Sequence, residues 1–168
     1  RHHIDRCFVC KTGTGGVVVE GGDRKTLKAC GHEITNNEIT DIGIRQRTHA
    51  YNVHISGVGI RLAHNEIRNA PHQAIGLGGN DHIIEYNKII NVCQESDDCG
   101  AFYMGRNPSE RGNIIRYNYW QDTGGPLSHG SCAIYLDDGT CGQEIYGNIF
   151  VRAAGGNFGA VFVHGGHD

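Results

Sequence analysis

Two adjacent carboxylates, Asp137 and Asp138, form the pair with the clearest potential for acid–base chemistry. They follow directly on the apolar strand 133–136, whose sequence is Ala-Ile-Tyr-Leu. Because neighbouring carboxylates repel each other, we expect the pKa of one of them to be raised, as a general acid requires. The alternative interpretation is an Asp-Asp-Gly turn with no chemical role.

A third carboxylate, Asp98, lies one repeat earlier beside a similar strand. In a fully extended strand it would lie at the opposite end from Asp137, roughly 20 Å away at about 3.3 Å per residue. The two carboxylates of a glycosidase lie only about 5–10 Å apart. We therefore expect one of two arrangements. Either the loop 94–100 folds over the outer face of these strands and brings Asp98 close to Asp137, or a different pair of carboxylates carries out the chemistry.

Three other apolar strands, 74–77, 101–104 and 160–163, share the pattern of strand 133–136 but end on different polar residues. Side chains alternate along a strand, so an outward aromatic strip should form on which sugar rings can stack. The alternative is that inserted loops cover these rings. We expect a groove along this outer face, with these candidate sugar-binding residues: His72, Tyr103, Arg106, Tyr135, His164, His167 and Asp168.

The C-terminal run His164-Gly-Gly-His167-Asp168 holds three residue types that bind either metal ions or sugar hydroxyls. We expect sugar hydroxyls as the partner. The sequence therefore predicts no metal site and no cofactor.

A second motif, aliphatic-x-x-Asn-x-hydrophobic, recurs along the chain at Asn37, Asn65, Asn87, Asn118 and Asn148. The spacings are 28, 22, 31 and 30 residues, and the shortest leaves room for three short strands and three turns. The apolar residues show no helical period, and β-branched residues are frequent. This pattern predicts an all-β solenoid, a parallel β-helix in which each strand pairs with its copy in the next coil.

The recurring Asn has two physical reasons to occupy a turn. Asn tolerates the left-handed backbone conformation, and its amide can bond to the Asn one coil away. We expect the five side chains to stack as a ladder.

Composition excludes some partners. The net charge is −3 with neutral His, so no basic field indicates nucleic-acid binding, and no apolar run is long enough for a membrane span. The chain 1–168 is interpreted as one β-helix domain that starts and stops inside a longer solenoid. Of the seven cysteines, Cys93–Cys99 or Cys132–Cys141 should form a disulfide in an oxidising compartment. The alternative is that Cys132 is a buried apolar residue.

The runs 70–75, 79–87, 98–106, 111–118 and 133–138, with the C-terminal 164–168, resemble the right-handed parallel β-helix proteins of the pectate-lyase-like superfamily. Glycoside hydrolase family 141, whose members act on α-L-fucosides or xylan, is the most similar family. The resemblance covers about residues 16–168 and implies a right-handed coil. It also implies that two aspartates, corresponding to Asp98 and Asp138 with Asp137 adjacent, act as the acid and its partner. Cys99 and His167 depart from the family pattern.

Three functions remain open at this point. The first is a secreted, extracellular or periplasmic glycoside hydrolase that works as a monomer on a plant or algal polysaccharide or its side chains, with Asp98, Asp137 and Asp138 as catalytic residues. The second is a polysaccharide lyase acting on a uronate-containing glycan, although no Lys lies at the strand ends. The third is a non-catalytic carbohydrate-binding solenoid, in which the aspartates only form turns.

Overall fold

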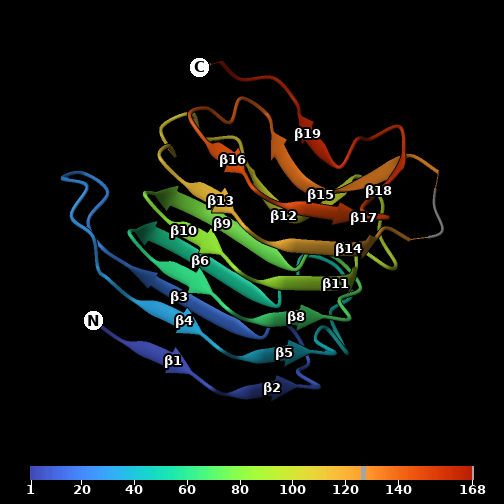
Figure 1. The fold of residues 1–168 in the computed structure, drawn as a ribbon, viewed down its shortest axis with the longest axis horizontal. Helices are drawn as coiled ribbons and strands as arrows, with labels where there is room; N and C mark the ends of the chain where they lie inside the picture. The colour runs from blue at the N-terminus through green and yellow to red at the C-terminus, as the bar shows by residue number, and fades with distance from the viewer. Residues whose placement is uncertain (126–127, 168) are drawn as a thin grey trace.

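The computed structural model describes residues 1–125 and 128–167, and this part of the chain contains nineteen β-strands and no helix (Figure 1). The strands form three sheets. The first contains β1 (His3–Asp5), β4 (Glu33–Thr35), β7 (Arg61–Ala63), β10 (Ile83–Glu85), β13 (Ile114–Arg116) and β16 (Glu144–Tyr146). The second contains β2 (Phe8–Cys10), β5 (Glu38–Thr40), β8 (Glu66–Arg68), β11 (Lys88–Val92), β14 (Tyr119–Thr123) and β17 (Ile149–Val151). The third contains β3 (Val17–Gly21), β6 (Val53–Val58), β9 (Ile75–Asn80), β12 (Cys99–Gly105), β15 (Gly130–Asp137), β18 (Ala154–Gly156) and β19 (Val161–Val163).

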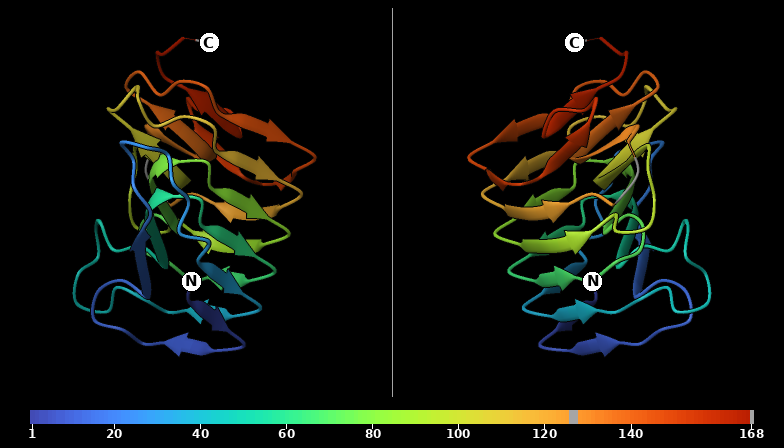
Figure 2. Two further views of the ribbon diagram at one scale, coloured as in Figure 1. Left: turned by 90° about the vertical axis from the view of Figure 1, so that its left-hand side faces the viewer. Right: turned by 90° about the vertical axis from the view of Figure 1, so that its right-hand side faces the viewer.

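Three consecutive strands, one in each sheet, make one coil of the chain, and the coils stack from β1 and β2 at one end to the C-terminal strands at the other (Figure 2). The pairing is parallel in every sheet, apart from β18, which runs antiparallel to β15. The repeat therefore gives an all-β stack of parallel strands, an arrangement consistent with a β-helix solenoid. No helix of the described residues is long and apolar enough to cross a membrane.

The hydrophobic positions of the repeat lie in register and form one core. Ile34 pairs with Leu62, Leu62 with Ile84, and Ile84 with Ile115, and all four are buried. The apolar strands of the third sheet align as the sequence predicts, since Phe102 pairs with both Ile75 and Ile134. Identical apolar positions stack at the strand spacing, so each coil covers the core of its neighbour.

The predicted Asn ladder is confirmed. In Asn65, Asn87, Asn118 and Asn148, Oδ1 accepts hydrogen bonds from the backbone N–H and the side-chain amide of the Asn one coil earlier, at 2.9 to 3.1 Å. We expected each ladder Asn to occupy the turn because Asn tolerates the left-handed backbone conformation, and this explanation is wrong. The residue before each Asn adopts that conformation instead: Asn36, His64, Tyr86, Tyr117 and Gly147. The Asn recurs because its side chain saturates backbone groups inside the corner.

The first coil, β1 and β2, is a feature that the sequence pattern missed. Cys7 occupies the ladder position there, and its backbone N–H donates to Asn37 Oδ1 at 2.9 Å. An amide N–H is present in every non-proline residue, so the ladder can end on a residue that has no side-chain amide.

Neither of the two disulfides predicted for an oxidising compartment is present in the structure. Cys93, Cys99, Cys132 and Cys141 are buried free thiols. Burial raises the pKa of the Cys93 thiol, and the neighbouring Cys99 and Cys132 raise it further. These cysteines fill core space, as the alternative interpretation of Cys132 expected.

Candidate functional site

A hollow of about 460 Å³ lies on the outer face of the third sheet, where β12 and β15 meet the loops that precede β6, β9 and β12. We name it the carboxylate hollow. It is lined by His49, His72, Gln73, Asp97, Asp98, Tyr103, Gly105, Arg106 and Asp137. These residues come from four successive coils, so the hollow exists only when the strands are stacked.

Glycine makes room for the hollow. Gly105 pairs with Asp137, and a Cβ at Gly105 would lie 2.9 Å from the Cβ of that residue. Gly76 occupies the outward position next to Tyr103, where a Cβ would lie 2.8 Å from the Tyr51 ring. Side chains at either position would displace residues packed around the hollow.

Asp137, at the end of β15, is buried and fully engaged. Its carboxylate accepts a hydrogen bond from the Tyr103 hydroxyl at 2.9 Å and one from the backbone N–H of Asp138 at 2.9 Å. Its Oδ1 also lies 2.9 Å from His164 Nδ1. Burial works to raise the pKa of Asp137, but these hydrogen bonds together lower it below its ordinary value. For Asp137 the expected upward shift of the pKa is therefore wrong.

Asp98 reaches the same place despite the position of its backbone. The hydroxyl of Tyr135 donates to Asp98 Oδ1 at 3.3 Å, and the Tyr135 ring packs beside Tyr103, whose hydroxyl donates to Asp137. Asp98 and Asp137 therefore line one hollow. The expected separation of 20 Å is wrong for the side chains, because the loop before β12 folds over the groove.

Asp97 holds this loop in place. Its carboxylate accepts hydrogen bonds from the backbone N–H groups of His129 at 2.6 Å and Gly130 at 2.7 Å. The backbone N–H of Asp98 donates to the carbonyl of Gly130 at 2.8 Å. Asp98 itself has a φ of 50°, a left-handed conformation that is costly for a residue with a side chain.

Asp138 and Arg106 form an exposed ion pair, with Nε 3.2 Å from Oδ2. Both residues also have left-handed backbones, with φ of 35° and 71°. Arg106 N–H donates to the Asp138 carbonyl at 3.1 Å, so the two turns are stacked like the strands before them. Three charged residues of the site, Asp98 included, thus combine left-handed backbone conformation with exposure, which is common at functional sites.

His164, after β19, extends the site by one coil. Its ring stacks on Phe162 with centroids 5.6 Å apart, and its hydrogen bond to Asp137 raises the pKa of the imidazole. Nδ1 also lies 3.7 Å from Asp138 Oδ1. Ligand atoms of Asp137, Asp138 and His164 lie within 4.8 Å of one another, so these three residues could hold a divalent cation.

The aromatic strip is present but differs from its predicted use. The Tyr135 ring contacts Tyr103 and Phe162, with centroids 5.6 Å and 5.0 Å apart. Phe158 packs against it as well, and Tyr135 is only 4% exposed. Its ring is therefore covered, as the alternative interpretation stated, and only its hydroxyl serves the site. Tyr103 and Phe162 remain half-buried.

Among the other candidates, His72 lies in the carboxylate hollow, and burial, with His49 nearby, lowers the pKa of its imidazole to about 4. His167 lies instead in a separate hollow of about 430 Å³ near the C-terminal end. Asp168 lies outside the described residues. Sequence reasoning missed Gln73, although it directly precedes the strand with the shared pattern, and it missed His49, for which no local pattern exists.

No protein family, curated protein or solved structure matches the chain.

Proposed function

We propose that the protein is a carbohydrate-active enzyme, a glycoside hydrolase that acts on a plant or algal polysaccharide or its side chains. The observation that carries this proposal is that Asp98 and Asp137, from different coils, line the same hollow. Glycosidic cleavage uses two carboxylates about 5–10 Å apart, and two carboxylates facing one hollow suit that chemistry. The carboxylates lie at an open hollow of about 460 Å³, large enough for a sugar unit.

The environments of the carboxylates differ, and this difference assigns their roles. Asp137 is buried among hydrogen-bond donors that favour its charged form, which suits a nucleophile or a general base. Asp98 is exposed at the same hollow, where it would exchange a proton with the glycosidic oxygen and with water. Arg106 with Asp138, together with His72 and Tyr103, would hold the sugar hydroxyls.

The charge of the hollow favours a hydrolase over a lyase. Asp97, Asp98 and Asp137 face Arg106 there, and burial keeps His72 neutral near pH 7. An acidic hollow repels the carboxylate of a uronate, which a lyase must bind and neutralise. The proposed substrate is therefore a neutral glycan.

We propose the matching architecture and setting as well. The stacked parallel strands support a right-handed parallel β-helix of the pectate-lyase-like type, most similar to glycoside hydrolase family 141. A polysaccharide substrate favours an enzyme that works as a monomer outside the cell or in the periplasm.

Product analysis tests the proposed reaction. The protein is incubated with a panel of plant and algal glycans, and both new reducing ends and near-ultraviolet absorbance are recorded. We expect reducing ends without the absorbance of an unsaturated sugar. Asp98→Asn and Asp137→Asn should each remove turnover while circular dichroism stays unchanged, whereas the exposed Asp81→Asn should retain it. Unsaturated products, or wild-type rates in both site variants, would contradict the proposal.

A further inference from the structure

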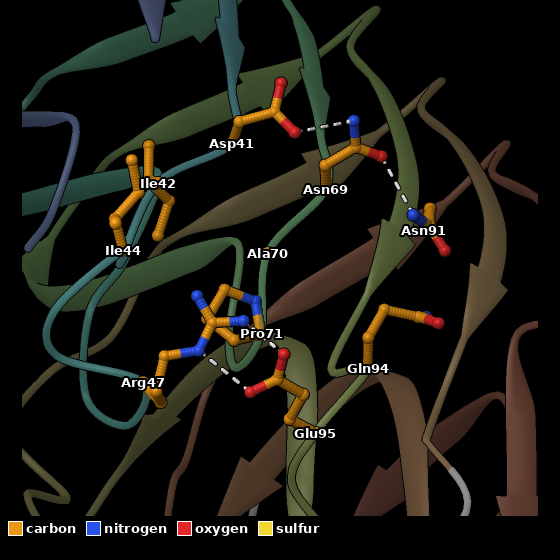
Figure 3. Close-up of a pocket in the computed structure, with 10 residues that line it drawn as sticks. All are labelled: Asp41, Ile42, Ile44, Arg47, Asn69, Ala70, Pro71, Asn91, Gln94 and Glu95. Carbon is orange, nitrogen blue, oxygen red and sulfur yellow. Dashed lines mark hydrogen bonds and ion pairs between the residues drawn. The ribbon is translucent and has the colours of Figure 1, made fainter. Parts of the chain in front are cut away.

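A second hollow, of about 490 Å³, lies at the turns between the second and third sheets (Figure 3). We name it the amide hollow, after the Asn side chains in its wall. The residues around it come from loop 41–47, from 69–71 and from 91–95. None of them belongs to the set that lines the carboxylate hollow.

One wall of the amide hollow is a polar ladder. Asn91 Nδ2 donates to Asn69 Oδ1 at 2.8 Å, and Asn69 Nδ2 donates to Asp41 Oδ1 at 3.1 Å. Figure 3 shows the three side chains in a row along one side of the hollow. An Asn amide has two N–H donors and two acceptor lone pairs, and Asn91 uses one N–H in the ladder. The ladder therefore retains capacity for sugar hydroxyls.

The opposite wall combines apolar and charged groups. Ile44 is 52% exposed, although it is a large aliphatic residue, and Pro71 lies near it. Arg47 and Glu95 form an ion pair from two loops, with Nε donating to Oε2 at 2.8 Å. A pyranose has an apolar ring face and a polar rim. In this hollow, Ile44 and Pro71 offer an apolar surface for the ring face, and the Asn ladder offers polar groups for the rim.

The two hollows share one ridge. Arg47 and Pro71 face the amide hollow, whereas His49 and His72 face the carboxylate hollow from the same segments. The rings of His49 and His72 lie 5.1 Å apart. In the third segment, Glu95 faces the amide hollow and Asp97 faces the carboxylate hollow. The ridge is thus built from three chain segments that present successive residues to opposite sides.

The ridge also contains buried polar atoms with no partner among the described residues. These atoms are His72 Nδ1, Gln73 Oε1 and Ser96 Oγ, in side chains that are 7%, 3% and 8% exposed. Most buried polar atoms in folded proteins have a hydrogen-bond partner. Six such atoms occur among the described residues, and three of them lie in this ridge.

We propose that the two hollows form a single groove for a neutral oligosaccharide that crosses this ridge. The sugar at the reacting bond occupies the carboxylate hollow, and a sugar farther along the chain occupies the amide hollow. This inference rests on the proposed function for the first hollow. Acidic residues outnumber basic ones in both hollows, and in the amide hollow they are Asp41 and Glu95 against Arg47. The whole groove therefore disfavours an acidic glycan.

The test compares short and long neutral oligosaccharides with a variant of the amide hollow. Ile44→Asp removes the apolar wall and adds a negative charge, and the matched control is Leu27→Asp, which changes a residue that is 54% exposed outside both hollows. The probes are the disaccharides and hexasaccharides of xylan, cellulose and mannan, with hexagalacturonate as the acidic comparison. Binding is measured calorimetrically with the Asp98→Asn variant, and kcat/KM with the active protein.

We expect Ile44→Asp to weaken hexasaccharide binding and kcat/KM by about tenfold, the factor given by one modest contact, and to leave disaccharide values unchanged. Leu27→Asp should change neither. Equal effects on both lengths, no effect on either, tighter binding of hexagalacturonate, or binding of none of the probes would overturn the inference. Length-dependent binding without turnover would support the shared groove and contradict the hydrolase function. Turnover without length dependence would support the hydrolase function and contradict the shared groove.

Discussion

The Asn corner and the outer face of the third sheet are both built from positions that repeat once per coil, yet they repeat differently. In the corner, Asn65, Asn87 and Asn118 make the same bonds to the next coil. On the outer face, Gly105, Asp137 and the residues after them differ from one coil to the next. Identical stacked residues saturate each other along the stack, whereas different ones leave groups directed outward. In this stack of coils, the repeated bonds and the variable polar groups thus occupy different positions within the coil.

The largest effect should come from the outer face. Asp137→Asn removes the charge that the hydrogen bonds of Tyr103 and His164 stabilise, so we expect turnover to fall by about 10³-fold, within the usual range for a proton-transferring group. The melting temperature should change far less than in a variant of the Asn corner. Steady-state kinetics and thermal unfolding of the same preparation measure both. If Asp137→Asn lost its fold together with its activity, the outer face would contribute to stability as the Asn corner does, and the two regions would not differ in role.

The Asn corner should show the opposite behaviour. Asn87→Ala leaves the backbone N–H of Asn65 and the carbonyl of Leu62 without their partner in a buried corner. At about 1–3 kcal/mol for each unsatisfied group, the free energy of unfolding should fall by about 3 kcal/mol. Urea denaturation measures it, and the exposed Asn157→Ala serves as control. A loss below about 0.5 kcal/mol would show that the Asn ladder does not contribute to the stability of the coils.

A smaller effect tests the link between the two carboxylates. Tyr135→Phe keeps the buried ring and its packing against Phe158 but removes the hydroxyl that donates to Asp98 in the hollow where Asp137 also lies. We expect kcat to fall by about tenfold, since one hydrogen bond to a charged group contributes roughly 1.5–3 kcal/mol at most. The control is Tyr117→Phe on the exposed side of the Asn corner. Unchanged kcat in Tyr135→Phe would show that the hydroxyl does not align the pair.

The smallest effect is a pH effect. The hydrogen bond to Asp137 raises the pKa of His164 above its ordinary value, and the same contact lowers the pKa of Asp137. The contribution of His164 to stability is full below about pH 6.5, its unfolded pKa, and is lost as pH rises through the raised folded value. The contribution of Asp137 is lost as pH falls through its lowered pKa. NMR titration of His164 should give a lower pKa in Asp137→Asn, and an unchanged value would rule out the pair.

Some features of the site were predictable because they follow from the pattern of single strands. Strands with one apolar pattern align in register, so Tyr103, Tyr135 and Phe162 lie side by side as expected. Alternation along β15 directs Asp137 outward. The direction of its pKa shift was not predictable, because the donors that lower it come from β12 and from the residue after β19.

What the sequence alone determined is the repeat. Its period set the coils, its apolar positions set the register, and its Asn residues set the ladder, because each of these depends on a residue and its own copy in the next coil. The tertiary structure alone decided that Asp98 and Asp137 line one hollow, that Phe158 packs on Tyr135 and that the cysteines are free thiols. These contacts join residues that are not copies of each other and whose loops follow different paths. Their distances depend on how far each side chain reaches across stacked coils, which no local pattern specifies.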